Sequence, residues 1–446
     1  MNNFLKKKFK EINTIDSYIN SFEVDKYLFI YEIKIISSYI KSLYLSNFIN
    51  FEEKKKFLNS LILIKKNFKY KNIENIHNYI KNELIRYNGT KILFLNNFNK
   101  NEQFNILNKV MLLDEIEKIN IQIIFLRKTI ISIAEKEFNT LIPSFKNSDI
   151  DKPITLGHYL LSWNEMFKRD HINLLNCKKI TNFCSFDNEI LFKNNYKINK
   201  NVIKKLLNFK NINENLIDSI SDRDYIVLFS QFCNILIIHL SRICEDIIYW
   251  SNKQYKFIDF INKNKKNFYI FEIIRSKTGR VLGNSINIIT VLKAQSIFNN
   301  KDNLEDKESY FDNIYTIKKS LYYFNQCLLT LKFNKKNFYI SSLKNYSTNS
   351  SIIYYLIKKG ESIENANITV NNCINYCNNK KINFFNISLK ELKKINLLFE
   401  NDIFYFLSIE STIKMKTIYG STSPNQVLKS IQRSKFFLNN IILKFK

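Results

Sequence analysis

Apolar residues recur at steps of three and four along several long stretches of the chain. Between positions 24 and 45 they include Leu28, Tyr31, Ile35 and Leu43. Residues 103–137 keep the same spacing and contain neither glycine nor proline. This spacing predicts amphipathic helices, and at about 1.5 Å per residue the second helix would be roughly 50 Å long.

Four further stretches show the same spacing, at 154–180, 223–250, 270–298 and 308–332. Only 6 glycines and 3 prolines occur among 446 residues. Both residue types interrupt helices, and an all-β fold needs many of them for its turns. Long helices that are apolar on more than one face usually form an extended bundle. We therefore predict an all-α fold around a central bundle of long helices.

Changes in this pattern predict three regions. Residues 1–100 would form an N-terminal helical domain, residues 101–340 the central bundle, and residues 341–446 a C-terminal domain of shorter helices with polar breaks. Stretches that are irregular and polar, or rich in asparagine, predict loops between helices. These predicted loops lie at 95–101, 184–200 and 259–268.

The most apolar stretch, 225–250, is interrupted by polar residues that include His239 and Asp246. It lacks the ~18 uninterrupted apolar residues of a membrane span, so it predicts a buried core helix. The seven cysteines are scattered and odd in number, as is typical of a reduced cytoplasmic protein. Neither the cysteines nor the four histidines have metal-ligand spacing. We expect a cytoplasmic protein with no metal and no membrane partner.

The net charge of +28 permits a different hypothesis, a basic nucleic-acid-binding helical protein. The lysines are spread along the chain, however, and form no stripe with interleaved aromatic residues. Lysine, asparagine and isoleucine are abundant while glycine and proline are scarce, a skew that AT-rich coding produces wherever selection is weak. Compositional bias is therefore the favoured explanation, and we predict no nucleic-acid partner.

Eight short motifs mark the chain from about residue 20 to residue 432. They occupy 24–33, 74–77, 152–158, 218–225, 277–284, 305–308, 347–360 and 419–424. In order and spacing they resemble the motifs of the argininosuccinate lyase family. Residues 218–225 resemble its DAVSDRDF segment, 277–284 its KTGRVYGN segment, and 305–308 match its EDKE run. Eight matches in the right order are specific, and they favour this family over the fumarases and adenylosuccinate lyases of the same superfamily.

The resemblance implies a fold, an assembly and a reaction. The subunit would have three helical domains, and the central domains of four subunits would pack into one bundle, giving a homotetramer. Each active site would be assembled from segments of three chains. The reaction in arginine biosynthesis splits argininosuccinate into arginine and fumarate by β-elimination, without a cofactor. Such a site needs a base for a proton beside a carboxylate, fixed positive charge for the resulting dianion, and a proton for the leaving guanidine.

Part of the family's catalytic set is present in this sequence. Lys265 and Asn267, followed by Glu272, resemble the family's KKNPDxxExIR element. The resemblance implies that Lys265 stabilises the carbanion, Asn267 binds the carboxylate and Glu272 orients its neighbours. It also implies three substrate-binding residues. These are Ser21, Asn101 at the asparagine of the SRNDQ motif, and Lys307 in the EDKE run.

Other parts of the catalytic set are replaced. The segment between Trp250 and Lys265 is shorter than in the family, and the missing piece is the loop that carries the catalytic serine. Asn147 stands where the family has its histidine, followed by Ser148. An asparagine side chain is neither an acid nor a base near neutral pH, and losing one such group typically costs about 10²–10⁴-fold in rate. Two hypotheses follow: an argininosuccinate lyase of reduced activity, and an inactive relic or structural subunit of the same fold.

Overall fold

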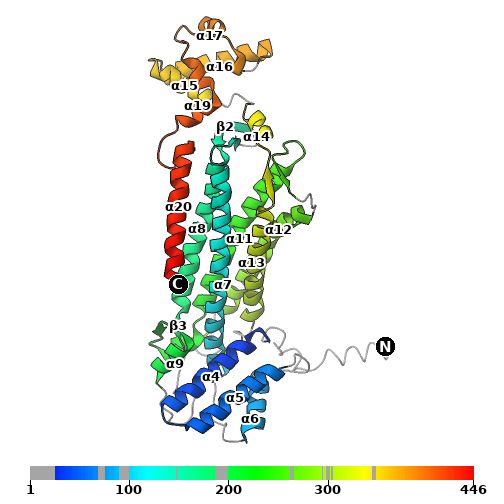
Figure 1. The fold of residues 1–446 in the computed structure, drawn as a ribbon, viewed down its shortest axis with the longest axis vertical. Helices are drawn as coiled ribbons and strands as arrows, with labels where there is room; N and C mark the ends of the chain where they lie inside the picture. Colours follow the sequence, from blue (N-terminus) through cyan, green and yellow to red (C-terminus); the bar gives the residue numbers. More distant parts are fainter. Residues whose placement is uncertain are drawn as a thin grey trace, which may run out of the picture. The chain divides into compact units, whose positions relative to one another are not determined.

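The computed structural model describes residues 26–68, 76–89, 100–146, 149–185, 199–261, 266–293, 295–297, 302, 305–343, 348–382 and 384–445. Over these residues the chain is mainly helical (Figure 1), which confirms the predicted all-α fold. Five helices are much longer than most of the others. They are α7 (Lys100–Lys136), α8 (Leu156–Thr181), α11 (Asp224–Ser251), α12 (Lys266–Leu292) and α13 (Asp306–Leu328).

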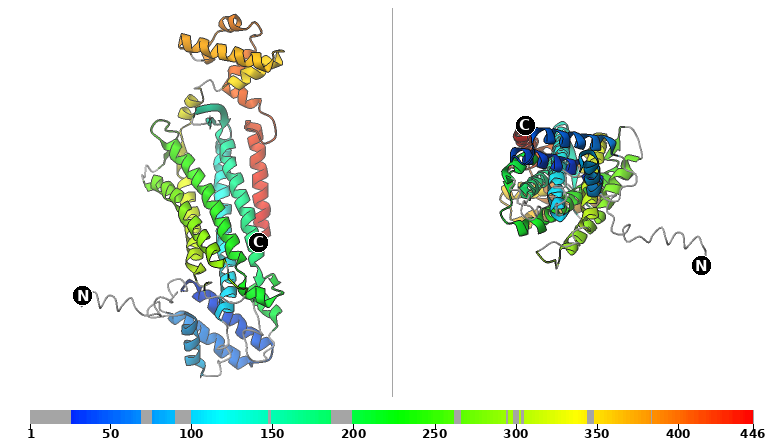
Figure 2. Two further views of the ribbon diagram at one scale, coloured as in Figure 1. Left: turned by 180° about the vertical axis from the view of Figure 1, so that it is seen from behind. Right: turned by 90° about the horizontal axis from the view of Figure 1, so that it is seen from below.

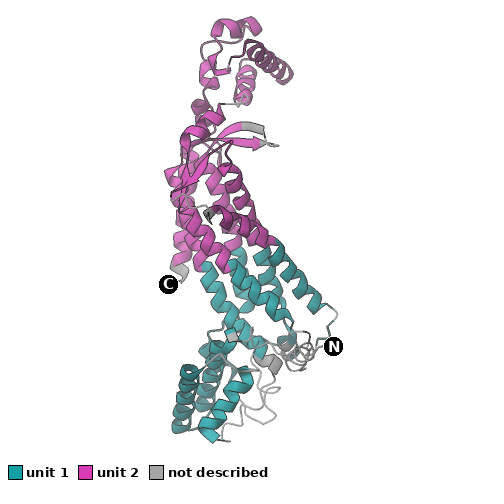
Figure 3. Ribbon diagram, turned by 90° about the vertical axis from the view of Figure 1, so that its right-hand side faces the viewer, with its two compact units in different colours: residues 1–120, 172–234, 279–317 teal, residues 121–171, 235–278, 318–446 magenta. Residues whose placement is uncertain are grey.

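The chain divides into two compact units, shown in different colours in Figure 3. Unit 1 consists of 1–120, 172–234 and 279–317, and unit 2 of 121–171, 235–278 and 318–446. Each of the five long helices contributes a segment to both units. The division into domains 1–100, 101–340 and 341–446 stays a prediction.

Unit 1 contains a set of shorter helices in addition to its segments of the long ones. They are α4 (Phe29–Leu45), which follows the 3-10 turn η1 (Lys26–Leu28), and α5 (Phe51–Asn67), α6 (Ile76–Asn88), α9 (Lys200–Leu207) and α10 (Leu216–Ser221). Helix α4 packs against α5 and α9, and α5 packs against α6. Asparagine side chains at positions 50, 199 and 215 accept hydrogen bonds from the first-turn N–H groups of α5, α9 and α10, so the abundant asparagines begin helices here. A short parallel pairing joins β3 (Phe183–Cys184) to β4 (Asn211–Ile212).

Unit 2 contains an antiparallel hairpin of β1 (Leu141–Lys146) and β2 (Asp149–Thr155). Pro143 lies opposite Pro153, and both are tolerated because each strand of a two-stranded sheet is an edge strand. The third proline, Pro424, is the first residue of α20 (Pro424–Phe445), where its missing N–H costs nothing. All three prolines therefore lie where a backbone donor is not required.

A second strand pair in unit 2 corrects two boundaries. Residues 259–268 were expected to be a loop, but β5 (Ile258–Phe260) pairs with β6 (Leu331–Phe333), and α12 begins already at Lys266. The helix expected at 308–332 ends at Leu328 for the same reason. Ile258 and Phe260 are buried on either side of exposed Asp259, an alternation too short to stand out in an Asn/Lys-rich sequence.

The C-terminal part of unit 2 has its own apolar core. It is formed by α15 (Asn349–Lys358), α16 (Ile363–Lys380), η4 (Phe384–Asn386), α17 (Leu389–Ile395) and α18 (Ile403–Leu407). In the sequence it follows α14 (Lys335–Ser342) and precedes α19 (Ile409–Lys414). Tyr355, Phe399 and Ile403 lie at its centre, with both Cys373 and Cys377 fully buried among them. These cysteines are packing residues, one helical turn apart on the same face of α16.

Helix α11 is the one described helix that is long and apolar enough to cross a membrane. In its most apolar window, where the mean hydropathy is 1.7, 61% of the residues are buried. Trp250, Ile243 and Phe229 are each at most 3% exposed. This burial agrees with the core helix predicted from the sequence.

Candidate functional site

The described residues among the six expected at the active site divide between the two units. Asn101 and Lys307 belong to unit 1, and Asn267 and Glu272 to unit 2. Ser21 and Lys265 lie outside the described residues, as do Asn147 and Ser148. Asn101 lies in the first turn of α7 and Asn267 in the first turn of α12. Glu272 is exposed, one turn further along α12.

Lys307 is the expected site residue with the best-defined surroundings. It is 4% exposed, and its Nζ lies 4.0 Å above the ring of Phe104. Phe104 follows Asn101 by one turn of α7, so unit 1 brings the EDKE motif close to the start of that helix. A buried ammonium over an aromatic face is held by cation–π attraction.

The SDRD and EDKE motifs meet beside Lys307. Arg223 Nε lies 3.3 Å from Asp306 Oδ2, and both side chains are at most 2% exposed. Burial raises the pKa of Asp306 to about 6, although the nearby charges of Arg223 and Lys307 act in the opposite direction. The motifs that suggested the family are therefore in contact in the fold, and they place ionisable groups inside unit 1.

Lys109 is a buried cation that sequence reasoning missed. It is fully buried on α7 and donates to Asp222 Oδ2 and to Ser185 Oγ, both at 2.8 Å. Its Nζ also lies 5.2 Å from the ring of Tyr225. The available signal was a lysine whose neighbours three residues before and after it, Ile106 and Leu112, are apolar and buried.

An aromatic cluster in unit 2 joins strand β1 to the segment that leads into β5. Phe145, which precedes the Asn147 position on β1, has its ring 5.5 Å from Tyr249 and 5.9 Å from Tyr255. Tyr255 in turn lies 5.1 Å from Phe257, which leads into β5. Strand β1 and the segment that leads into β5 therefore pack against one group of rings.

Gly157 and His158 end the motif at 152–158. A Cβ built on Gly157 would lie 2.7 Å from Phe138 Cα and 2.9 Å from the Ala134 carbonyl oxygen, so only glycine lets α8 begin against the end of α7. His158 follows in the first turn of α8. Burial, and then the charge of Lys416, lower the pKa of His158. At neutral pH this histidine is therefore uncharged.

The C-terminal motif at 419–424 is tied to the same hairpin. Thr422 Oγ1 accepts from the backbone N–H of Thr155 at 2.7 Å, and the hydroxyl of Thr155 donates to the Thr422 carbonyl at 2.9 Å. Gly420 has φ +78°, a left-handed conformation that suits glycine. This segment leads into α20, which runs beside α8 in two opposite views (Figure 1, Figure 2).

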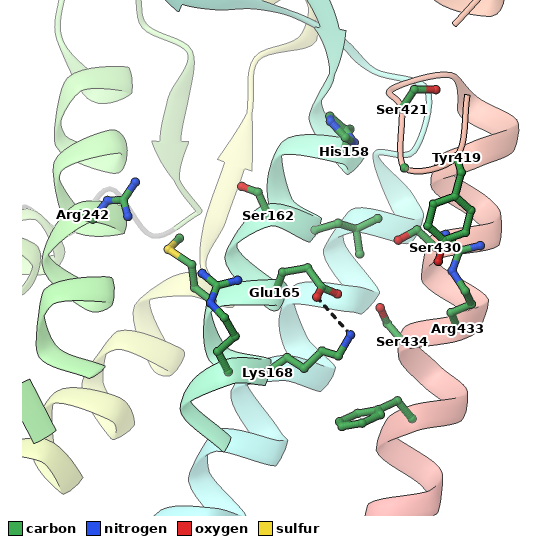
Figure 4. Close-up of a pocket in the computed structure, with 15 residues that line it drawn as sticks. His158, Ser162, Glu165, Lys168, Arg242, Tyr419, Ser421, Ser430, Arg433 and Ser434 are labelled. Carbon is green, nitrogen blue, oxygen red and sulfur yellow. Dashed lines mark hydrogen bonds and ion pairs between the residues drawn. The ribbon is translucent and has the colours of Figure 1, made fainter. Parts of the chain in front are cut away.

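A cavity of about 590 Å³ lies between α8, α11, α20 and the 419–421 turn of unit 2. Figure 4 shows its lining, in which one ion pair, Lys168 to Glu165 at 3.1 Å, is drawn. Its other ionisable lining side chains are His158, Arg169, Arg242, Tyr419 and Arg433. No sequence motif predicted this cavity, because its cations come from three separate helices.

Among the residues that the structure describes, no group of three histidine, cysteine or acidic side chains could hold a metal ion. The seven cysteines are all buried, and burial raises the pKa of Cys177 to about 12 and that of Cys327 to about 11. A buried thiol with a raised pKa is a poor nucleophile.

The fold and the chain's motifs define a helical lyase of the fumarase/aspartase superfamily. A family model described as "Lyase" matches residues 98–283. The crystal structure of EDDS lyase in complex with formate superposes with a TM-score of 0.84 at 19% identity, covering 94% of this chain and 89% of that one. At this identity the superposition supports the fold.

Sequence relatives give the family. The chain is 33% identical to the argininosuccinate lyase of Caldicellulosiruptor saccharolyticus over 447 aligned positions, covering 95% of each chain. It is also 33% identical to that of Ruthia magnifica subsp. Calyptogena magnifica, covering 81% of this chain and 77% of the relative. This protein belongs to the argininosuccinate lyase family.

Proposed function

We propose that this protein is an argininosuccinate lyase, which cleaves argininosuccinate to arginine and fumarate by β-elimination in the cytoplasm and needs no cofactor. The observation that supports this most directly is the similarity to curated argininosuccinate lyases over 95% of both chains. The contact between the SDRD and EDKE motifs agrees with it, because Arg223 and Asp306 form a buried pair. The proposed role is biosynthesis of arginine.

Six residues would bind and activate the substrate. Lys265 stabilises the carbanion, Asn267 binds its carboxylate, and Glu272 orients their neighbours. The substrate-binding residues are Ser21, Asn101 and Lys307. Their grouping is supported by Lys307, whose Nζ lies 4.0 Å from the centre of the Phe104 ring. Phe104 follows Asn101 by one turn of α7. Fixed ammonium groups beside a developing dianion supply the electrostatic stabilisation that such a reaction needs.

The proposed assembly is a homotetramer in which several chains complete each site. Unit 1 supports it through exposed apolar residues on α12, where Leu282, Ile286 and Ile289 are 46–57% exposed at steps of four and three. Unit 2 exposes Ile235 and Ile238 on α11, each more than 40%. An apolar helical stripe of this kind is stabilised when another chain covers it.

The proposed rate is lower than that of a lyase with the full catalytic set. The family's serine loop is shortened here, and Asn147 replaces its histidine. Positioning and fixed positive charge remain available, and these contribute to catalysis without a perfectly matched base. We expect turnover that is about 10²–10⁴-fold slower than with a positioned general base, yet faster than the uncatalysed reaction.

The test is an assay of the purified full-length chain with argininosuccinate, followed by the absorbance of fumarate and by arginine release. We expect Lys265→Ala to abolish turnover, whereas Lys253→Ala, at an exposed position earlier in the sequence, should leave it unchanged. If fumarate formed no faster with the protein than in a solution of substrate alone, the lyase activity would be refuted. The hypothesis of an inactive relic or structural subunit would then remain.

Mixing two inactive variants tests the shared sites. Lys265→Ala and Lys307→Ala would damage segments from different chains of one site, so mixed tetramers should contain some intact sites and recover activity. Unmixed variants should stay inactive. No recovery in mixtures whose mass confirms mixed tetramers would contradict sites that are shared between chains.

A further inference from the structure

The cavity in unit 2 is unlike the proposed active site in its composition. Four of its lining residues are permanently cationic near neutral pH, namely Lys168, Arg169, Arg242 and Arg433. The cavity has a single carboxylate, Glu165, which accepts a hydrogen bond from Lys168 at 3.1 Å. None of the six residues proposed for catalysis and substrate binding lines it.

None of the three guanidinium groups forms a salt bridge with a carboxylate of the residues that the structure describes. The charge of Arg242 does act on Asp246, and that of Arg169 on Asp170, without a direct contact. Arg433 instead stacks on the ring of Tyr419, with its Cζ 4.5 Å from the ring centre. Like charges gathered around one cavity repel one another, and an anion between them would relieve that repulsion. Figure 4 shows Arg242 and Arg433 on different helices that border the cavity.

The walls of the cavity are held in place by contacts that do not involve its charges. The 419–421 turn is anchored by the two hydrogen bonds between Thr155 and Thr422. Helices α8 and α20 are joined by a hydrogen bond from Asn164 Nδ2 to Ser434 Oγ at 3.2 Å, where both residues are buried. A ligand would therefore enter a site that is largely formed in its absence, which lowers the cost of binding.

We propose that this cavity binds a small polyanion, a molecule with at least two phosphate or carboxylate groups. Arginine presents several N–H donors in a fork that matches both kinds of group. A volume of about 590 Å³ lies within the range of small-molecule sites. The three arginines are exposed at the open side of the cavity, and their origin on three helices favours a ligand with several anionic groups.

Calorimetric titration of the full-length chain tests the proposal, with pyrophosphate and citrate as separate probes at near-physiological salt. We expect saturable binding of one probe molecule per chain. Arg242→Gln and Arg433→Gln should each weaken it about tenfold or more, the effect of losing one charge-assisted hydrogen bond. Lys429 is an exposed residue of α20, one turn before Arg433, and it does not line the cavity. Lys429→Gln should therefore leave the affinity unchanged. Preference for pyrophosphate would identify a phosphate ligand, and preference for citrate a carboxylate ligand.

Unsaturable binding, or equal weakening by all three substitutions, would overturn the proposal, since either result would mean only general attraction to a chain of charge +28. A second measurement uses the unaltered protein, so that a variant that fails to fold does not decide the matter. Hydrogen exchange should slow in residues 158–169 and 419–434 when the preferred probe is added, and unchanged exchange there would equally refute the site. Neither experiment uses argininosuccinate, so the outcome is independent of the proposed lyase activity.

Discussion

Substitution of Gly157 by alanine should destabilise unit 2 even though alanine is the better helix former. The added Cβ would lie 2.7 Å from Phe138 Cα, 2.9 Å from the Ala134 carbonyl oxygen and 3.1 Å from Val427 Cγ1. Two of these neighbours are backbone atoms, which cannot turn aside as a flexible side chain would. The start of α8 is also fixed, because Gly157 N–H donates to the Glu137 carbonyl at 3.0 Å.

The expected size follows from two opposing effects. Overpacking of a well-packed interior typically costs about 1–3 kcal/mol, and two backbone contacts under 3 Å place this site toward the upper end. Alanine recovers at most about 1 kcal/mol of helix propensity over glycine, and less in a first turn. We therefore expect Gly157→Ala to lower the free energy of unfolding by about 1–2 kcal/mol.

The two tryptophans make the assay specific. Trp163 lies on α8, Trp250 on α11, and their rings stack with centres 5.9 Å apart, both in unit 2. Urea unfolding followed by tryptophan fluorescence therefore reports on the unit that contains Gly157. Gln432→Ala, at an exposed position of α20 in the same unit, is the matched control and should be neutral or slightly stabilising. If Gly157→Ala unfolded at the same urea concentration as the unaltered chain, or at a higher one, the steric argument would be wrong.

Three further predictions concern buried polar groups. Thr422→Val should cost about 1–3 kcal/mol of stability, because it leaves the buried N–H of Thr155 without its acceptor. Thermal unfolding would measure this loss, and Thr422→Ser, which keeps the hydroxyl, is the control. Lys109→Met should also destabilise the chain by about 1–3 kcal/mol. The loss is smaller than for breaking a fully buried ion pair, because the partner Asp222 is 21% exposed. An unchanged unfolding midpoint would contradict this. Burial raises the pKa of Asp306 from 3.8 to about 6, so the folded chain keeps a proton that the unfolded chain releases. Stability should therefore fall as pH rises from 3.8 to 6, by about 3 kcal/mol, and unfolding curves of Asp306→Asn should lack this component.

Much of the helical fold could be predicted because the signal is local. A helix in a bundle must repeat its apolar residues every three or four positions, so α7 was predicted to within a few residues of its ends. Short strands have no comparable repeat. Ile258 and Phe260 bury their side chains on β5, but three residues are too few to show a period of two.

The candidate site likewise has a part that could be predicted from local sequence and a part that could not. The motifs that contain Asp222 and Asp306 could be recognised one at a time, since each is a run of neighbouring residues. That Arg223 meets Asp306, or that Lys109 is fully buried against Asp222, depends on helices that approach from distant parts of the chain. No local pattern encodes such a distance.

The sequence by itself determined the all-α class, the positions of the long helices and the family, because periodicity and motif order are properties of the chain as written. Only the tertiary structure decided why Gly157 must be glycine, which cations are buried, and that Arg242 and Arg433 border one cavity. These two arginines are 191 positions apart in the sequence, and packing alone brings their charges to the same space. Sterics and electrostatics act through distance in space, which a linear sequence does not contain.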